Sequence, residues 1–302
     1  MKKVGIVGYG HVGKAMHKIF PDAIIYDSYD PDYNDTQEQI NKECGLAIIC
    51  VPTNALEDGG CDISIVKSSV AWLETPLILV KSTVEPGTTD SLKTRYKKRI
   101  CMSPEYFGES KYWVPESWTI RGWPFLIVGG DDKDVTEIFD YFIPMLGPTK
   151  SYFKCGALEA ELIKYMENSY LATKVTFTNE MYKICQVFGA DWYKVWEGWA
   201  LDPRVEKSHS AVFPEDKGFA GKCLPKDVSA IVRAAQKAGY EPEFLKEVLS
   251  TNAKFRVMNN ASNDNTNARV QSKKLPNGQD KTKRKVSRYH RRKESTSKIA
   301  TG

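Results

Sequence analysis

Residues 4–13 read Val4-Gly5-Ile6-Val7-Gly8-Tyr9-Gly10-His11-Val12-Gly13, a short apolar run followed by spaced glycines. The run predicts a buried strand, and the amphipathic segment 14–20 after it predicts a helix. Glycines at these intervals between a strand and a helix are typical of a dinucleotide-binding turn. Gly8 permits the tight turn, Gly10 the approach of a pyrophosphate, and Gly13 close packing of the helix. The stretch therefore predicts a Rossmann domain.

An acid, Asp27, ends the next apolar run and lies nineteen residues after Gly8. In a dinucleotide fold such an acid accepts hydrogen bonds from the ribose hydroxyls, and its charge repels a 2′-phosphate. The N–H groups that begin the first helix attract the phosphates. We therefore predict NAD as the cofactor, in preference to NADP.

Short apolar runs alternate with helical spacing through the first half of the chain. The predicted strands are 47–53, 77–81, 100–102 and 125–128, and the predicted helices are 63–73, 89–96 and 134–146. This alternation indicates an α/β fold with a parallel, doubly wound sheet. We assign residues 1–150 to this NAD-binding domain.

The pattern changes after residue 150. Residues 157–188 contain no proline or glycine and keep helical periodicity throughout, which predicts one long helix. Further helices are predicted at 191–198, 226–238 and 242–257. We assign residues 151–258 to a mainly helical second domain.

Residues 259–302 are rich in Asn, Ser, Thr, Lys and Arg and contain almost no large apolar residues. Such a segment buries too little surface to offset the entropy of ordering it, so we expect a disordered tail. It holds 12 Lys and Arg against 3 Asp and Glu, a net +9, so the remaining chain carries −4 of the total +5. The basic cluster 281–293 is either a solvated tail or a weak site for an anionic partner such as nucleic acid.

Composition excludes several classes of protein. The seven cysteines include no CxxC pair, so neither a disulfide framework nor a zinc site is indicated, and no metal is expected. This usage fits a reducing cytoplasm. No apolar run reaches the ~18 residues of a membrane span, and the N-terminus leads into a strand without a signal-peptide cleavage site.

One cysteine occupies an unusual loop. The segment 216–227 reads Asp216-Lys217-Gly218-Phe219-Ala220-Gly221-Lys222-Cys223-Leu224-Pro225-Lys226-Asp227. Nearby cations lower the pKa of a thiol, and the thiolate is the nucleophile. The segment is therefore either a nucleophile loop or a surface turn with an incidental cysteine.

Five more motifs lie between the glycine turn 8–13 and the cysteine loop 216–227. They are Val51-Pro52-Thr53, Lys81-Ser82-Thr83-Val84-Glu85-Pro86-Gly87-Thr88-Thr89, Ser103-Pro104-Glu105-Tyr106-Phe107-Gly108-Glu109-Ser110, Glu161-Leu162-Ile163-Lys164-Tyr165-Met166-Glu167-Asn168 and Asn179-Glu180-Met181. Together they resemble the UDP-glucose/GDP-mannose dehydrogenase family over about residues 1–257. The resemblance implies an NAD-dependent enzyme that oxidises the C6 alcohol of a nucleotide sugar, most simply UDP-glucose, to the uronate in two hydride transfers.

The resemblance also implies roles for individual residues. Cys223 would attack the C6 aldehyde to form a thiohemiacetal, whose oxidation gives a thioester that water releases. Lys164 and Asn168 would stabilise the oxyanion, and Asp227 would handle protons or orient water. Glu105 and Thr83 resemble the residues that activate this water.

Further contacts are carried over by position. For the cofactor, the resemblance adds His11, Val12, Pro52, Thr53, Thr83 and Lys226 to the glycines and Asp27. For the substrate, it indicates Glu105, Tyr106, Phe107, Glu109, Lys164, Asn168, Arg204, Phe219 and Gly221. Arg204 resembles an arginine that reaches the substrate of a neighbouring subunit.

The sequence departs from the family in three places. Residues 27–47 are shorter than usual, Ala220 stands where the family usually has glycine, and the family's third, nucleotide-binding domain is expected to be absent. Two other functions therefore remain open: a truncated, non-catalytic NAD-binding dimer, and a β-hydroxyacid-type dehydrogenase with a small substrate. The aromatics Tyr165, Tyr170, Phe177 and Tyr182 on the long helix predict either a homodimer seam or a monomeric core stripe.

Overall fold

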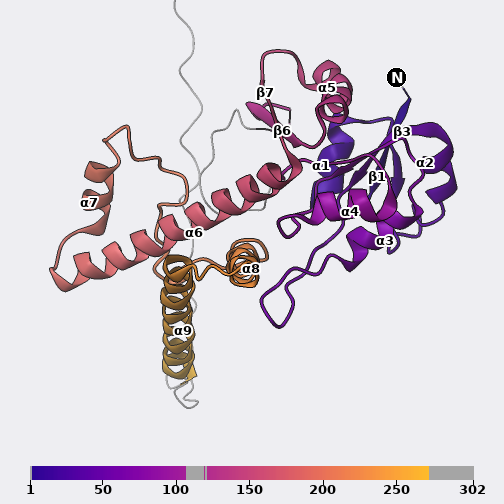
Figure 1. Ribbon diagram of the computed structural model, residues 1–302. Coiled ribbons are helices and arrows are strands. Elements are labelled where there is room, and N and C mark those ends of the chain that lie inside the picture. The colour runs from indigo at the N-terminus through magenta and orange to yellow at the C-terminus, as the bar shows by residue number, and fades with distance from the viewer. Residues whose placement is uncertain (1, 107–118, 120, 272–302) are drawn as a thin grey trace, which may run out of the picture. The chain divides into compact units, whose positions relative to one another are not determined.

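The computed structural model describes residues 2–106, 119 and 121–271, with side chains as far as Met258. Residues Met1–Ala261 form one compact unit, and residues Ser262–Gly302 form a second. The first unit contains a sheet and a set of helices that pack around it and beside it (Figure 1).

A seven-stranded sheet is the centre of the first part of the chain, with the order β2-β1-β3-β4-β5-β6-β7. The strands are β1 (Lys3–Val7), β2 (Ile24–Tyr26), β3 (Cys44–Ile49), β4 (Leu77–Val80), β5 (Ile100–Met102), β6 (Phe125–Gly129) and β7 (Ser151–Cys155). Neighbours from β2 to β5 are parallel, β6 is antiparallel to β5, and β7 is parallel to β6. The predicted α/β class is confirmed, with one antiparallel pairing and with β7 extending the sheet to Cys155.

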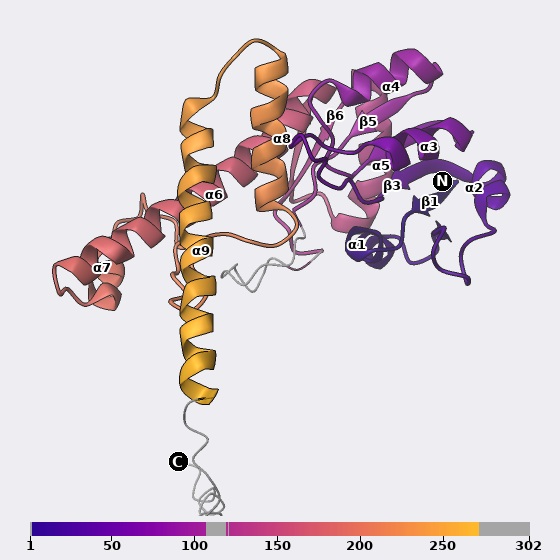
Figure 2. The ribbon, with the colours of Figure 1, turned by 90° about the horizontal axis from the view of Figure 1, so that it is seen from below.

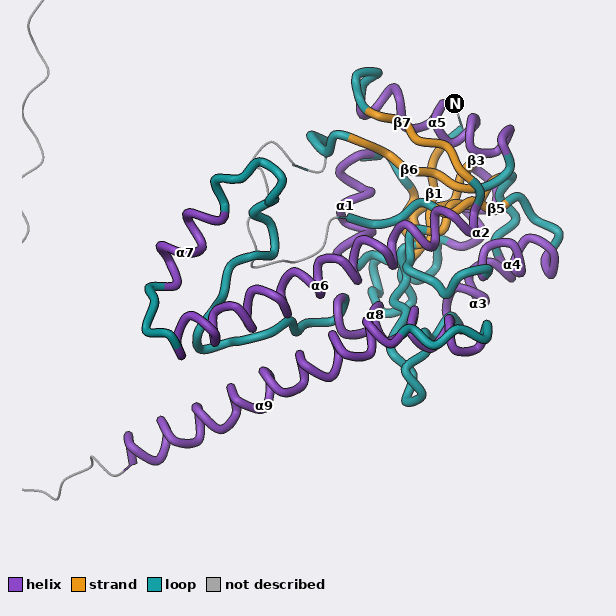
Figure 3. Tube along the Cα trace, turned by 60° about the vertical axis from the view of Figure 1, so that its left-hand side comes forward, coloured by secondary structure: helices purple, strands orange, loops and turns teal. Residues whose placement is uncertain are grey.

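The helices divide into two groups. Those around the sheet are α1 (His11–Ile19), α2 (Gln37–Glu43), α3 (Ser64–Trp72), α4 (Thr88–Tyr96) and α5 (Asp132–Leu146). Those of the second part are α6 (Ala157–Val187), α7 (Trp192–Trp199), α8 (Leu224–Lys237) and α9 (Glu243–Gln271). Figure 3 shows α6 leaving the sheet region, with α7 at its far end.

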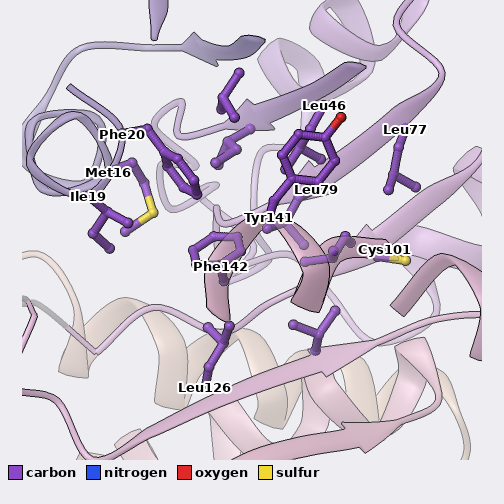
Figure 4. Close-up of a cluster of buried hydrophobic side chains, with 14 of the residues drawn as sticks. Met16, Ile19, Phe20, Leu46, Leu77, Leu79, Cys101, Leu126, Tyr141 and Phe142 are labelled. Atoms are coloured by element: carbon purple, nitrogen blue, oxygen red, sulfur yellow. The ribbon is translucent and has the colours of Figure 1, made fainter. Parts of the chain in front are cut away.

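Both faces of the sheet are covered by apolar side chains. On one face, residues of α1 and α5 such as Met16, Ile19 and Phe142 pack against Leu46 and Leu79 (Figure 4). On the other face, α2, α3 and α4 contribute Ile40, Val66, Val70 and Leu92. Burying each such side chain contributes about 1.5–3 kcal/mol, so the near-continuous apolar strands read from the sequence are explained by two-sided burial.

A buried carboxylate joins α6 to the sheet part. Glu161 is 1% exposed and accepts hydrogen bonds from Gly87 N at 2.5 Å, Thr89 N at 2.8 Å and Thr89 Oγ1 at 2.6 Å. Helix α4 has no side-chain cap of its own, so Glu161 serves as its N-terminal cap from a distant part of the chain. Burial raises the pKa of this carboxyl, and the hydrogen bonds from Thr89 and Gly87 oppose the rise.

The start of the tail differs from expectation. We expected disorder from residue 259, whereas α9 continues to Gln271. A helix that is already nucleated gains one hydrogen bond for each added residue, so moderate helix formers such as Asn and Ser can prolong it. The basic cluster 281–293 lies outside the described residues.

Neither a membrane-spanning helix nor a metal-holding group occurs among the described residues. No helix among them combines the length and the apolar character needed to cross a membrane. Within the same residues, no group of three or more His, Cys, Asp and Glu side chains is arranged to hold a metal ion.

Substituting Glu161→Ala removes the cap of α4 and leaves buried N–H groups without an acceptor. We expect the free energy of unfolding to fall by about 3 kcal/mol, because hydrogen bonds to a charged group are the strong ones. Urea denaturation followed by circular dichroism measures the change.

The matched control is Glu159→Ala, an exposed acid in the same first turn of α6. Its loss should cost less than about 1 kcal/mol, the usual contribution of a first-turn acid to the helix dipole. Equal losses for the two variants would contradict the capping role of Glu161.

Candidate active site

The glycines of the first turn have the geometry that the sequence predicted. Gly8 has φ +92°, and a Cβ there would lie 2.8 Å from the carbonyl oxygen of Cys50. A Cβ on Gly13 would lie 2.0 Å from Gly8 O, whereas a Cβ on Gly10 would meet no atom within 4 Å. Two glycines therefore allow close packing of the backbone, and the third leaves open space at the start of α1.

Asp27 is fixed at the end of β2. Its Oδ2 accepts from Tyr9 N at 2.6 Å and its Oδ1 accepts from Tyr29 N at 2.9 Å. A carboxylate has about four acceptor sites, so two engaged N–H groups leave capacity for hydroxyl donors. The Tyr9 ring packs edge-on against Tyr33, with centroids 5.1 Å apart, in the shortened region after β2.

These residues fit a bound dinucleotide. The α1 N-terminus has no side-chain cap, and a helix N-terminus of this kind attracts phosphates. His11 is exposed and Val12 half-buried at this helix start, and Pro52 is exposed after β3.

The α6–α8 contact holds a buried polar cluster. Asn168 donates from Nδ2 to Asp227 Oδ2 at 2.5 Å, and Lys226 Nζ donates to Asp227 Oδ1 at 2.5 Å. Asp227 is 2% exposed and Asn168 4%. Cys223 is exposed and is the N-cap residue of α8, and its carbonyl accepts from Asp227 N at 2.8 Å. The structure therefore brings Asn168, Asp227 and Lys226 together, one turn from the thiol.

Lys164 lies one turn before Asn168 on α6. It is buried, and its Nζ donates to Glu167 Oε2 at 2.8 Å. The ammonium also lies 5.0 Å from the centroid of the Tyr106 ring, a cation–π distance. Lys164 thereby links α6 to the segment after β5 that carries Glu105.

Glu105 forms a buried ion pair that the sequence did not reveal. Its Oε2 lies 3.6 Å from Lys81 Nζ, and Lys81 is 3% exposed. Lys81 also donates to Pro104 O at 2.9 Å and to Ser103 Oγ at 3.3 Å. The Lys81 ammonium thus joins the ends of β4 and β5 and fixes the position of the Glu105 carboxylate.

A buried thiol connects the cofactor segments to α8. Cys61 Sγ lies 3.5 Å from Thr83 O and 4.0 Å from Thr53 O, both within its hydrogen-bond reach. Burial raises the pKa of the Cys61 thiol, and the charge of Lys226 acts against the rise. Thr53 is buried and Thr83 half-buried, and the Cys61 thiol that contacts both also feels the charges of Lys226 and Asp227.

Other predicted residues lie elsewhere. The Phe219 side chain is 1% exposed and packs in a core cluster, so its ring does not face a substrate. Gly221, with φ +84°, is exposed in the same loop. Phe107 and Glu109 lie outside the described residues.

Arg204 is exposed and pairs with Asp202 of its own turn, with Nη2–Oδ2 at 2.5 Å. It lines a pocket of about 440 Å³ with Lys174, Phe177, Trp199 and residues of α9. Its described contacts do not include the Asn168–Asp227 cluster.

Sequence reasoning gave no role to Lys81, Cys61, Glu161, Asn179 or Asn252, all of which are buried. A signal existed for Glu161, Asn179 and Asn252, because a polar residue on the apolar stripe of a helix needs a buried partner. The partners themselves come from distant segments and were not visible in the sequence.

A mostly parallel sheet with an open glycine turn is joined to a long helix with buried Lys and Asn side chains, and this defines a Rossmann-type α/β architecture. Residues 158–254 match the central domain of the UDP-glucose/GDP-mannose dehydrogenase family. The chain is thus a relative of this family, and the resemblance seen in its sequence is confirmed.

Curated relatives of the chain are named as enzymes of the same family. UDP-glucose 6-dehydrogenase AglM of Haloferax volcanii is 32% identical over 228 residues, 68% of this chain and 51% of the relative. UDP-glucose 6-dehydrogenase TuaD of Bacillus subtilis is 30% identical over 226 residues, 70% of this chain and 47% of the relative. The chain spans about half the length of these relatives.

Solved structures show the same fold. A UDP-glucose dehydrogenase from Pyrobaculum islandicum superposes with a TM-score of 0.72 at 24% identity, covering 84% of this chain and 68% of that one. A UDP-D-ManNAc dehydrogenase from Pyrococcus horikoshii gives 0.70 at 19% identity, covering 89% and 72%.

Alanine at Gly10 and at Gly13 should have different effects. Gly13→Ala places a methyl group against Gly8 O and should lower the free energy of unfolding by about 2 kcal/mol. Gly10→Ala meets no protein atom, so its melting temperature should stay within about 2 °C, while its Kd for NAD rises at least about tenfold. Calorimetric melting and titration with NAD measure both quantities. Unchanged NAD affinity of Gly10→Ala would refute the assignment of this turn to the pyrophosphate.

Proposed function

We propose that the chain is an NAD-dependent dehydrogenase that oxidises the C6 alcohol of a nucleotide sugar, first of all UDP-glucose, to the uronate. The observation that carries the proposal is the buried Asn168–Asp227–Lys226 cluster one turn from the exposed Cys223. Curated relatives named UDP-glucose 6-dehydrogenase support the choice of substrate.

Cys223 suits the role of nucleophile. It stands at the N-terminus of α8, where the helix dipole favours a thiolate. It is the exposed cysteine among the described residues, so a substrate can reach it. Its sulfur adds to the C6 aldehyde to form a C–S bond, and the carbonyl oxygen becomes an oxyanion.

Lys164 and Asn168 suit the role of oxyanion donors. Both are buried on one side of α6, where a fixed donor contributes on the order of 3 kcal/mol to the stability of a developing oxyanion. An amide group carries two N–H donors. The hydrogen bond of Asn168 to Asp227 uses one and leaves the other for the oxyanion.

The chemistry that bound NAD would supply is acceptance of a hydride from C6 in each of the two oxidations. The residues that would hold it are those of the turn 8–13, with Asp27 at the ribose and Pro52, Thr53, Thr83 and Lys226 toward the nicotinamide. The space at Gly10 and the position of Asp27 fit this assignment.

Hydrolysis completes the reaction. A water oxygen bonds to C6, the C–S bond breaks, and the Cys223 sulfur leaves as thiolate, while the water gives up its proton to a base. Asp227, held between Asn168 and Lys226, and Glu105, held by Lys81, are the carboxylates that suit this task. Thr83 offers a hydroxyl to orient the water.

Two other functions use the same fold. A β-hydroxyacid-type dehydrogenase would use Lys164 and Asn168 but has no need of a thiol on α8. A non-catalytic NAD-binding dimer would keep the cofactor turn without turnover. The contact between the Cys223-bearing helix and Asn168 favours the thiol chemistry over both.

The seam of a homodimer lies, we propose, on the exposed face of α6. Leu158, Leu162, Met166 and Tyr170, spaced four residues apart, and Phe177 are all exposed large apolar residues. Of the two alternatives for the aromatics of α6, Tyr165 fits the core stripe, because its side chain is 1% exposed and packs with Cys61 and Ala230 of its own chain. Contiguous exposed apolar patches of this kind mark interfaces.

The activity is tested by incubating the protein with NAD and a panel of UDP- and GDP-sugars and counting NADH per product. We expect two NADH per uronate, and loss of this turnover in Cys223→Ser, because serine is a poorer nucleophile and cannot form the thioester. Cys155→Ser, at a half-buried cysteine of β7, is the matched control and should retain full activity.

One NADH per product from a small hydroxyacid would favour the β-hydroxyacid reading instead. NAD binding without turnover of any sugar would leave the non-catalytic dimer. Either result would overturn the proposed function.

The dimer is tested with Met166→Asp. Met166 is 77% exposed, so the substitution should leave the circular dichroism spectrum of the fold unchanged while it shifts the mass measured by light scattering from dimer to monomer. The control Val257→Asp changes a similarly exposed residue on α9 and should remain dimeric. A Met166→Asp protein that stays dimeric would rule out this seam.

A further inference from the structure

The loop that carries Cys223 has little structure of its own. Residues 216–223 contain no helix or strand, and Gly218 and Gly221 take the left-handed φ values +77° and +84°. Ala220, Lys222 and Cys223 are exposed. A loop of this kind keeps one conformation only when its buried backbone groups find partners elsewhere.

Asn252 of α9 supplies such a partner. Its Oδ1 accepts from Phe219 N at 2.7 Å and its Nδ2 donates to Phe219 O at 3.0 Å. The side chain is 7% exposed. One amide therefore pairs with both polar groups of a single residue, as a neighbouring strand would, and this fixes the orientation of the peptide as well as its position.

Two further side chains form hydrogen bonds with the same loop. Asn179 of α6 accepts from Gly218 N at 3.2 Å through Oδ1. Arg256, one turn after Asn252, donates to Lys217 O at 3.2 Å and pairs with the Asp216 carboxylate. We call Asn179, Asn252 and Arg256 the loop clamp.

Position 218, where the loop meets Asn252, requires glycine. A Cβ on Gly218 would lie 2.4 Å from Asn252 Oδ1, too close for any atom that cannot move. The Phe219 ring next to it is buried in a cluster with Val175 of α6, Val228 of α8 and Val248 of α9. The loop is thus anchored by its backbone and its side chain at one residue.

The anchor is close to the thiol. Three residues separate Phe219 from Cys223, and Cys223 is the N-cap residue of α8. A rotation of the Phe219 peptide therefore moves the rest of the loop as far as Cys223, where α8 begins. Figure 2 shows α9 beside α8 and crossing α6, the two helices that carry the proposed reaction centre.

We propose that Asn252 is a positioning residue for Cys223: its side-chain amide, acting through the Phe219 peptide, sets the orientation of the loop and hence of the thiol relative to Asn168 and Asp227. The role of the thiol rests on the proposed function. The clamp itself is a property of the folded chain, so it can be measured without turnover.

Two variants test the clamp. Asn252→Leu has nearly the same size and removes both hydrogen bonds, and Asn252→Asp keeps the acceptor for Phe219 N but loses the donor to Phe219 O. We expect the Gly218 and Phe219 amides to exchange hydrogen at least about tenfold faster in Asn252→Leu, the equivalent of one lost hydrogen bond. Exchange in the sheet should not change.

Kinetics separates positioning from stability. In both folded variants kcat should fall at least about tenfold while the KM for NAD changes less than about twofold, because the cofactor turn is untouched. The rate at which iodoacetamide alkylates Cys223, followed by peptide mass spectrometry, should change by at least about threefold. Lys254→Ala, on the exposed side of α9, is the matched control and should behave as wild type.

The outcomes are distinct. Wild-type exchange at Gly218 and Phe219 in both folded variants would overturn the clamp. Faster exchange with unchanged kcat and unchanged alkylation would overturn positioning and leave a purely structural contact. If the wild-type chain turns over no nucleotide sugar, the proposed function fails, while exchange and alkylation still decide whether Asn252 controls the thiol.

Discussion

The hydrogen bond between Asn168 and Asp227 is a buried polar contact that joins α6 to α8 one helical turn from Cys223. Both partners are almost fully buried, and a buried carboxylate without partners is strongly destabilising. Asp227 is satisfied by Asn168 and by Lys226 of its own helix. The α6–α8 packing therefore has one allowed register, and Cys223, one turn before Asp227, is placed by it.

The same constraint repeats along α6. Glu161 caps α4, Lys164 meets the Tyr106 ring, Asn168 meets Asp227, and Asn179 meets Gly218. Each of these side chains is buried, and each connects to a segment distant in the sequence. Polar residues normally weaken a helix core unless they are satisfied. Here they specify which segment lies against which turn of α6, so one helix aligns four separate parts of the chain.

The sequence predicted these elements unevenly. The glycine turn, the apolar strands and the long helix follow from local spacing, and the structure has them at nearly the predicted residues. The antiparallel pairing of β5 with β6 and the presence of β7 depend on which edges meet, and spacing does not encode that. Lys81 was visible only as part of a motif, since its partner Glu105 is brought near by the sheet.

The residues of the candidate site were also predicted only as far as local spacing allows. Asn168 and Lys164 were correctly placed together, because i, i+4 residues share one side of a helix. Phe219 was predicted to contact a substrate, whereas its ring fills a core, and periodicity cannot be read in a loop of this kind. Asn252 was not singled out because its partner is a backbone, and backbone groups leave no trace in a sequence pattern.

Magnitudes show which contacts hold the sheet part and the helical part in place. Two ion pairs cross between them, Asp58 with Arg233 at 3.3 Å and Glu85 with Lys237 at 3.7 Å. Both are substantially exposed, and such pairs contribute about 0–1 kcal/mol. The buried bonds of Glu161 and the cluster of Cys61, Tyr165 and Ala230 contribute more, because each excludes water. The distance between the cofactor turn and the thiol therefore depends on the first turns of α6 and changes little with salt.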